Sequence, residues 1–368
     1  ANKTFSQRMT EANFTSLDGI KEAFSVEKVT KEFYADISNW FDWALQTVKY
    51  PDGARVAEKG FEMSVIRLIT RMIFIWFMRV KGLISKDLFD QDTIRFMIAE
   101  FDQPNSSSYY QAILQNLFFA TLSTEVSKRE LRSDPGFKNM QRDYGKAGVF
   151  RFKSLFFDQA TINRLFKDIP FLNGGLFTCL DVRKDPAKGI NEEIFIDGFS
   201  DNPKHQAHVP NRLFFGDDTK IDLNDDYGTK DKTYTVRGLI KTFERFNFTI
   251  DENTPDDQDV ALDPELLGQV FENLLARINP ETSVAARKET GSFYTPREIV
   301  DFMVDESLLA FFQSYLLRIM PETQQLEPRL RALLSYHSDP PIFTEEETEC
   351  LIEAIDQIRV LDPACGSG

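Results

Sequence analysis

The sequence has few of the residues that build metal sites and disulfide frameworks. Its 368 residues include three cysteines and three histidines. The cysteines, Cys179, Cys350 and Cys365, form no CxxC pair and share no ligand spacing with the histidines. The sequence therefore predicts neither a zinc site nor a disulfide framework. His205 and His208 fall in a polar stretch between two prolines, where a surface loop is the simpler interpretation.

Long uninterrupted hydrophobic runs are also missing. The most apolar stretch runs from Phe61 to Ile84, but Arg67, Arg71 and Arg79 interrupt it at helical spacing. A membrane-spanning helix needs roughly 20 consecutive apolar residues, and no run approaches that length. The stretch therefore predicts a core helix. The N-terminal residues are polar and lack the apolar centre of a signal peptide. We expect a cytoplasmic protein with no membrane partner.

The chain has no general surplus of positive charge. Its net charge is −15, and a charge spread evenly would repel DNA phosphates. Between residues 128 and 153, however, eight basic residues stand against three acidic ones, with aromatic residues among them. This segment is the candidate DNA-backbone surface, and a solvated loop beside core aromatics is the alternative. Its predicted DNA contacts are Lys128, Arg129, Arg132, Lys138, Arg142 and Lys146.

The residues that are abundant point to a helical core. Phenylalanine occurs 34 times, and apolar residues make up 42% of the chain. From about residue 26 to 165 the apolar residues recur at helical spacing, which predicts mostly long amphipathic helices. Residues from about 166 to 235 contain paired glycines, several prolines and clustered Asp and Asn, which predict loops and short strands.

An acidic stretch precedes the C-terminal part. Residues 251–265 carry seven acids and no base, which indicates an exposed linker or loop that faces away from DNA. Just after it, Leu266, Val270, Phe271 and Leu274 share one face of a predicted helix. We expect that face to dock on a neighbouring domain.

The C-terminal residues carry the strongest chemical signal. Ile358 to Leu361 is typical of a buried parallel strand, and a glycine-rich turn follows it. Doubly wound α/β folds receive nucleotide-like cofactors at such junctions, because glycine lets the backbone approach a ligand closely. An acid at the strand end suits a cationic or hydroxyl-bearing ligand better than a phosphate. The turn reads Asp362-Pro363-Ala364-Cys365-Gly366-Ser367-Gly368.

A well-specified helix start precedes this turn in the sequence. Thr295 can cap the helix, Pro296 fits its first turn and Glu298 lies within that turn. Each motif alone also fits an ordinary turn or capped helix, but the pair is far more specific. The segment reads Thr290-Gly291-Ser292-Phe293-Tyr294-Thr295-Pro296-Arg297-Glu298-Ile299-Val300.

Together the two motifs resemble motifs X and I of DNA adenine-N6 methyltransferases of the gamma order. In that family the motifs lie side by side around S-adenosylmethionine. The resemblance implies that Phe293 or Tyr294 packs on the cofactor and that Asp362 accepts a hydrogen bond from its methionine end. Thr295 and Pro296 would shape the methionine pocket. The implied cofactor site comprises Phe293, Tyr294, Thr295, Pro296, Asp362, Pro363, Ala364, Gly366 and Gly368.

Further blocks resemble the connector of large restriction-modification methylases. They cover residues 29–34, 169–177, 242–250 and 261–275. The chain thus resembles the front portion of a type IIG enzyme with type IIS cutting, a class that fuses nuclease, connector, methyltransferase and target-recognition domains.

The resemblance implies a mainly α fold, in which a large helical connector domain is followed by the truncated start of a Rossmann-like α/β S-adenosylmethionine-dependent methyltransferase domain. The expected divisions are an N-terminal arm at 1–25, a connector at 26–253 with a loop-rich insertion around 166–235, and the methyltransferase part at 254–368.

The family's catalytic motif is expected beyond Gly368. It reads Asn/Asp-Pro-Pro-Tyr/Phe, and its aromatic residue stacks on a flipped-out adenine. Within the chain, Ser338-Asp339-Pro340-Pro341-Ile342-Phe343 is superficially similar, but it precedes motif I and has Ile342 in place of the aromatic residue. We interpret it as a turn between helices. The polypeptide alone is expected to be inactive, and no catalytic residue is assigned.

A nuclease site is not assigned either. Type IIG enzymes usually hold Mg²⁺ with a Pro-Asp and a Glu-x-Lys element. Pro51-Asp52 is followed by Glu58-Lys59, where no residue separates the two charges, and Asp218-Thr219-Lys220 lies in an acidic loop. Mg²⁺ is expected only if an upstream nuclease domain exists.

The expected activity of the intact parent is N6-adenine methylation of double-stranded DNA, fused to a DNA endonuclease. Partners would be double-stranded DNA and the other domains of the same polypeptide. Two alternatives stay open. The parent could be a methylase without cleavage from a phage-defence system, or this portion could be a scaffold that couples nuclease, methyltransferase and recognition domains without activity of its own.

Overall fold

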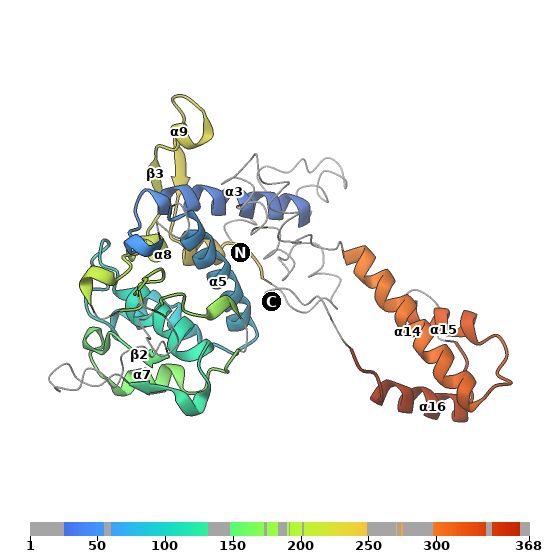
Figure 1. The fold of residues 1–368 in the computed structure, drawn as a ribbon. Coiled ribbons are helices and arrows are strands. Elements are labelled where there is room, and N and C mark those ends of the chain that lie inside the picture. The colour runs from blue at the N-terminus through green and yellow to red at the C-terminus, as the bar shows by residue number, and fades with distance from the viewer. Residues whose placement is uncertain are drawn as a thin grey trace. The chain divides into compact units, whose positions relative to one another are not determined.

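The computed structural model describes most of the chain in two units (Figure 1). Compact unit 1 comprises Ala1–Ala286 with Ser367–Gly368, and unit 2 comprises Arg287–Gly366. The boundary predicted between residues 253 and 254 lies outside the described residues and stays a prediction. The described residues are 26–54, 60–131, 148–172, 175–182, 190, 192–200, 202–248, 270, 274, 297–335 and 341–360.

Three long helices form the centre of unit 1. They are α3 (Val26–Leu45), α5 (Glu62–Val80) and the π-helix η2 (Tyr109–Leu122). The predicted core helix between Phe61 and Ile84 is thus confirmed as α5, which buries twelve of its residues. Among the residues of η2 only Gln111 is not buried. A π-helix of 14 residues is unusual, because this form mostly occurs as single-turn bulges.

Shorter elements surround these helices. Strand β1 (Glu130–Leu131) pairs in parallel with β2 (Val149–Phe150), and β3 (Thr219–Ile221) pairs antiparallel with β4 (Tyr234–Val236). The β3–β4 hairpin carries α9 (Asn224–Tyr227) and projects from the rest of the unit (Figure 1). The other short helices are η1 (Lys86–Leu88), α6 (Gln91–Arg95), η3 (Val126–Lys128), η5 (Lys153–Leu155), α7 (Ala160–Phe166), η6 (Gly175–Phe177), η8 (Pro203–His205), α8 (Arg212–Phe215) and α10 (Leu239–Phe243).

Mainly α architecture is therefore confirmed for the described residues, and the loops and short strands expected around 166–235 are present. The prediction of mostly long helices over residues 26–165 is only partly right. Long helices occupy only part of that range, because turns and single helical turns separate α5 from η2. No helix in the described ranges is long and apolar enough to cross a membrane.

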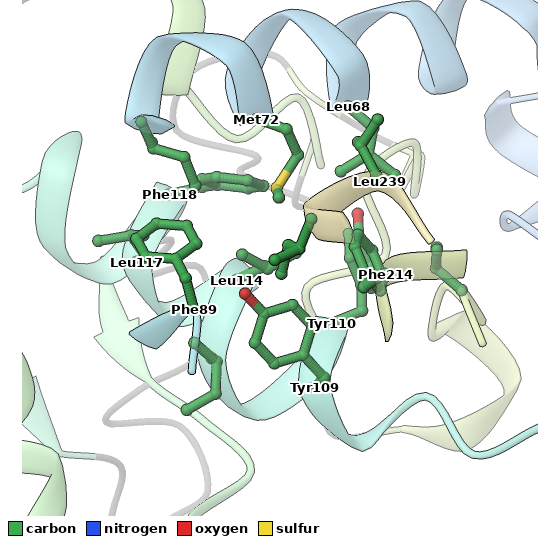
Figure 2. Packing of buried hydrophobic residues seen from close by; sticks show 14 of the residues in the cluster. Leu68, Met72, Phe89, Tyr109, Tyr110, Leu114, Leu117, Phe118, Phe214 and Leu239 are labelled. Carbon is green, nitrogen blue, oxygen red and sulfur yellow. The ribbon is translucent and has the colours of Figure 1, made fainter. Parts of the chain in front are cut away.

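Aromatic side chains fill the core of unit 1, as the phenylalanine content predicts. Figure 2 shows Tyr109, Tyr110 and Phe118 of η2 packed among Met72 of α5 and residues from later in the chain. Edge-to-face contacts recur in this core, for example Tyr109 with Phe215, whose ring centroids are 4.7 Å apart. Such pairs contribute about 0.5–1.5 kcal/mol each beyond the area they bury.

Two residues of the predicted helix after the acidic stretch also belong to this core. Val270 and Leu274 are helical and are 2% and 0% exposed. Both lie in the main hydrophobic cluster of unit 1. Val270 and Leu274 therefore pack into the core of unit 1, while Leu266 and Phe271 of the predicted face lie outside the described residues.

Unit 2 contains three helices, α14 (Arg297–Ile319), α15 (Leu326–Leu334) and α16 (Glu345–Asp356). Leu309, Phe312 and Leu316 of α14 lie in a cluster with Leu330 and Leu351. Thr344 caps α16: its hydroxyl accepts from the N–H of Glu347, while the Glu347 carboxylate accepts from the N–H of Thr344. This reciprocal pair is a capping box.

The segment that leads to the glycine-rich turn differs from the sequence prediction. Residues 358–360 form no strand, and Val360 is 90% exposed. The predicted buried strand is therefore wrong for these residues. A parallel strand needs hydrogen bonds from a neighbouring strand, and the described part of unit 2 contains none. Residues 338–343 are predicted to form a turn between helices. The described part agrees, because Pro341, Ile342 and Phe343 lie between α15 and α16.

Candidate functional site

The predicted cofactor site lies outside the described residues. This holds for Phe293–Pro296 and for Asp362–Gly368 alike. The structure describes only the residues next to these two segments. Helix α14 is described from Arg297, the residue after Pro296, and the described residues that follow α16 end at Val360. The roles inferred for these residues stay predictions, and the fit of S-adenosylmethionine to them is not tested by the described geometry.

Lys128 is the exposed member of the predicted DNA-contacting set. Its ammonium lies 2.8 Å from the carboxylate of Glu125, and the Lys128 side chain is 67% exposed. An exposed ion pair of this kind is weak, so Lys128 can leave Glu125 for an anion that binds it more strongly. Four other members of the set lie outside the described residues: Arg132, Lys138, Arg142 and Lys146.

Arg129 is held inside the fold by four backbone carbonyls. Its Nη2 donates to Thr121 O and Ile169 O at 2.9 Å each, while Nη1 donates to Phe166 O at 3.0 Å and Nε to Thr124 O at 3.1 Å. The guanidinium thus caps the carbonyl ends of η2 and α7. A phosphate contact would require it to leave these acceptors, so we omit Arg129 from the proposed DNA-contacting set.

Arg151 also contributes less to the surface than its charge suggests. Its side chain is 2% exposed, Nε donates to Phe199 O at 2.9 Å, and the guanidinium lies 4.8 Å from the centre of the Phe199 ring. Two of the eight basic residues between 128 and 153, Arg129 and Arg151, therefore bind groups inside the fold. The local charge surplus counted in the sequence overstates the charge that the surface presents.

A hollow of about 480 Å³ lies beside Lys128. Hydroxyl-bearing residues and Gly148 share its wall with Glu125 and Glu130. Because acids balance the single lysine, the described wall does not attract phosphate strongly. The lining residues are Ser123, Thr124, Glu125, Ser127, Lys128, Glu130, Gly148, Val149 and Phe171.

The block at residues 169–177, which carries part of the family resemblance, is anchored by two arginines. Arg129 binds Ile169 O at its start, and Arg71 Nε donates to Leu176 O at 2.8 Å near its end. Between them, Leu172 N donates to Leu122 O at 2.8 Å. The block is thereby fixed against both η2 and α5.

Arg71 forms the centre of a buried polar network. Its Nη1 lies 3.0 Å from Asp197 Oδ1, and both side chains are 3% exposed. Nη2 also donates to Thr178 O at 3.2 Å. Burial tends to lower the pKa of Arg71, but the Asp197 carboxylate and its neighbours more than offset this, so the pKa is raised. The Arg71 guanidinium therefore stays charged inside the fold.

Asp181 extends this network with a cradle of backbone donors. Its Oδ1 accepts from the N–H groups of Ile196, Asp197 and Gly198 at 2.7–3.0 Å, and its Oδ2 accepts from Phe199 N at 2.8 Å. Gly198 has φ +66°, and an added Cβ would lie 2.4 Å from Ala207 N. Consecutive N–H groups in this conformation form an anion-binding nest, which the chain fills with its own carboxylate. Burial and the nearby Asp197 raise the pKa of Asp181.

A second hollow, of about 680 Å³, lies between residues 100–111 and 206–208. Glu100, Gln103, Asn105 and His208 contribute to its polar wall. Burial and the neighbouring Lys49 lower the pKa of His208, so its imidazole is neutral at pH 7. The wall carries the carboxylates of Glu100 and Asp102 and no lysine or arginine, although Arg95 pairs with Asp102 from outside the lining. It is therefore unsuited to DNA phosphates.

Of the two nuclease candidates, Glu58 and Lys59 lie outside the described residues, and Asp218 and Lys220 form no metal site where they are described. Asp218 is a surface residue whose carboxylate lies 3.2 Å from Arg237, and Lys220 lies on the exposed strand β3. Within the described ranges, no three His, Cys, Asp or Glu residues come together as metal ligands. The histidine pair is explained by packing, since His205 stacks on Phe195 with ring centroids 4.1 Å apart.

Sequence reasoning missed the Arg71–Asp197–Asp181 network. Arg71 was visible as a charge within an apolar helix, which is the signal of a buried ion pair. Nothing local to Asp181 or Asp197 distinguishes them from the many surface aspartates. Only the fold shows that they share a buried site with Arg71.

One known protein has significant similarity to the chain. It comes from Methanocaldococcus jannaschii and is named "Putative type II restriction enzyme and methyltransferase", with 24% identity over 321 residues. The match covers 86% of this chain but only 20% of the relative, so the chain spans about a fifth of that protein's length. No family model and no solved structure matches the chain. The similarity connects the chain with proteins of the restriction-modification class.

Proposed function

We propose that the chain is the front portion of a restriction-modification protein that methylates adenine at N6 in double-stranded DNA. The observation that carries this proposal is the similarity over most of the chain to a protein named as a restriction enzyme and methyltransferase. The two motifs at 293–296 and 362–368 support it from the sequence side, because they fit the two halves of one cofactor site.

In this proposal S-adenosylmethionine supplies the methyl group. Phe293 or Tyr294 packs on the cofactor, Asp362 binds its methionine end, and Gly366 and Gly368 keep the turn open. The core of unit 1 holds Val270 and Leu274, and the unit offers DNA the exposed cation of Lys128. An endonuclease activity, and Mg²⁺ with it, is expected only if an upstream nuclease domain exists.

The test uses the intact gene product. We expect equilibrium dialysis to detect S-adenosylmethionine binding, and labelled methyl transfer to appear on adenine. Asp362→Ala and Tyr294→Ala should each weaken cofactor binding at least tenfold. Asp356→Ala, at the end of α16, is the matched control and should leave it unchanged. Wild-type affinity in both site variants would refute the assigned roles.

A second measurement separates the open alternatives. Incubation of the intact protein with DNA and Mg²⁺ shows whether it also cuts. Methylation without cleavage would identify a methylase-only parent. If the intact protein neither binds the cofactor nor methylates DNA, the scaffold alternative is supported.

A further inference from the structure

The larger hollow of unit 1, of about 680 Å³, takes no part in the proposed function. It lies between residues 100–107, Gln111 of η2 and the segment that contains Gln206 and His208. Binding clefts for small molecules measure about 300–1,000 Å³ and carry a few convergent polar groups. This hollow has such a size. Two carboxylates and four side-chain amides contribute to its wall, namely Glu100, Asp102, Gln103, Asn105, Gln111 and Gln206.

The loop that forms most of this wall is fixed by contacts from behind. The Nδ2 of buried Asn211 donates to Phe101 O at 3.0 Å and to Ser108 Oγ at 3.1 Å. The hydroxyl of Ser107 donates to Val209 O at 3.2 Å and accepts from Val209 N at 2.9 Å. A wall that is already ordered loses little conformational entropy when a ligand binds.

Two unusual backbone features meet at the same wall. Glu100 has φ +60°, a left-handed conformation that is costly for a residue other than glycine and that recurs at ligand sites. The π-helix η2 is also a form found frequently at functional sites, and its one residue that is not buried, Gln111, lines the hollow. The Nε2 of Gln111 donates to Gln206 Oε1 at 3.3 Å, which holds both amides at the wall.

The charge of the wall selects the kind of ligand. Glu100 and Asp102 are the charged groups among the lining residues, because the lowered pKa of His208 leaves its imidazole neutral. Arg95 lies outside the lining and is shared between Asp92 and Asp102, at 2.7 Å from each. It therefore does not neutralise the wall. A cleft lined by one sign of charge concentrates ions of the opposite sign.

Other classes of ligand fit this wall less well. A nucleobase normally stacks on aromatic side chains, and the described lining residues include no Phe, Tyr or Trp. A metal ion needs several converging ligands, and no three His, Cys, Asp or Glu residues of the described ranges come together to hold one. Anions are repelled by the two carboxylates.

We propose that this hollow binds a small organic cation of the polyamine class. Its ammonium groups donate hydrogen bonds to the carboxylates of Glu100 and Asp102 and to the amide oxygen of Gln111. Each primary ammonium group has three donors, which suits a wall rich in acceptors. The site is separate from the cofactor motifs, so the inference does not depend on the proposed function.

Isothermal titration of the 1–368 chain with spermidine tests the proposal. Spermidine also binds acidic surfaces weakly, and the chain has a net charge of −15, so variants of the wall decide the outcome. Gln111→Lys places a competing cation in the hollow and should weaken binding roughly tenfold, whereas Gln111→Glu should strengthen it. Gln159→Lys is the matched control, because Gln159 is exposed next to α7 and does not line the hollow. It should leave the affinity unchanged.

A second variant keeps the test decisive if Gln111→Lys fails to fold, which circular dichroism would show. Asp102 is 66% exposed, so Asp102→Asn removes a charge from the wall without opening the core. It should weaken spermidine binding roughly threefold by loss of one attractive charge.

Three results would overturn the proposal. The first is the absence of saturable spermidine binding. The second is equal affinity in the wall variants and in Gln159→Lys, which would mean adsorption to the acidic surface only. The third is binding of the uncharged polyol sorbitol, or of adenosine, at least as tightly as spermidine, which would assign the hollow to a neutral ligand.

Discussion

Arg71 and Asp197 form a buried ion pair with Nη1 and Oδ1 3.0 Å apart, although 126 residues separate them in the sequence. The same guanidinium binds the carbonyl oxygens of Leu176 and Thr178. One side chain of α5 therefore fixes two segments of the loop-rich region at once. The contacts of this one guanidinium thus join residues 176–178 and Asp197 to α5.

Removing that charge alone is expected to be costly. Arg71→Met should lower the free energy of unfolding of unit 1 by about 3–5 kcal/mol, because Asp197 then stays buried without its partner. The double variant Arg71→Met/Asp197→Leu should be more stable than the sum of the single losses. Urea unfolding followed by circular dichroism measures both. Arg95→Met, which breaks exposed ion pairs, is the control and should leave the midpoint unchanged. Strict additivity of the two single losses would contradict the buried pair.

Arg129 and Lys128 are neighbours with separable roles. Arg129→Met should destabilise unit 1 by about 1–3 kcal/mol, because several carbonyl acceptors lose their donor. Lys128→Met should leave the unfolding midpoint unchanged and, in the intact protein, weaken DNA binding and reduce its salt dependence. The measurements are urea unfolding and fluorescence anisotropy over a salt series. A stable Arg129→Met variant with impaired DNA binding would reverse the two assignments.

The capping box of α16 predicts a pH dependence of stability. The hydrogen bond from Arg329, with Nη1 2.9 Å from Glu347 Oε1, lowers the pKa of Glu347 from its ordinary 4.5 to about 2. Because the pKa is lower in the folded state, the carboxylate contributes its full stability above pH 4.5 and loses it as the pH falls toward 2. Thermal unfolding of unit 2 should therefore lose stability in this window.

Glu347→Gln should remove most of that loss and lower the stability at neutral pH. The neighbouring Glu346, which is exposed at the start of the same helix, supplies the control Glu346→Gln. If both variants lose stability with the wild-type pH profile, the ion pair does not contribute as described.

Asn116 supplies a further test, this time of the π-helix. Its Oδ1 accepts from Arg151 N at 2.9 Å, and its Nδ2 donates to Arg151 O at 2.9 Å. Asn116→Leu keeps the branching at Cγ but leaves both backbone groups of Arg151 unpaired, which should cost about 1–3 kcal/mol. The Arg151 amide should then exchange faster by hydrogen-exchange mass spectrometry. Asn116→Asp retains the acceptor, so it should protect that amide better than Asn116→Leu does.

Helix α5 illustrates what periodicity can predict. Apolar residues from Phe61 onward repeat at helical spacing, and the structure places the helix at Glu62–Val80. The helix predicted after residues 290–296 is likewise present as α14, while its predicted cap and proline lie outside the described residues. These features are local, since spacing and end residues bias the backbone before any tertiary contact forms.

Residues 358–360 and Arg129 illustrate the limits. A strand is stable only beside another strand, so an apolar run could not by itself place one at Val360. Charge counting could not show that Arg129 and Arg151 point into the fold, because burial depends on carbonyls contributed by distant segments. Asp181 shows the same dependence, since all four of its donors lie between Ile196 and Phe199.

The sequence by itself determined the helical character of the chain, its phenylalanine-rich core and the two motifs that suggest a cofactor. Each of these is encoded in spacing or residue type within a short window. The tertiary structure alone decided which charges are buried and how the block at 169–177 is anchored. These properties arise from contacts between residues far apart in the chain, because only chain folding brings a buried charge to its partner.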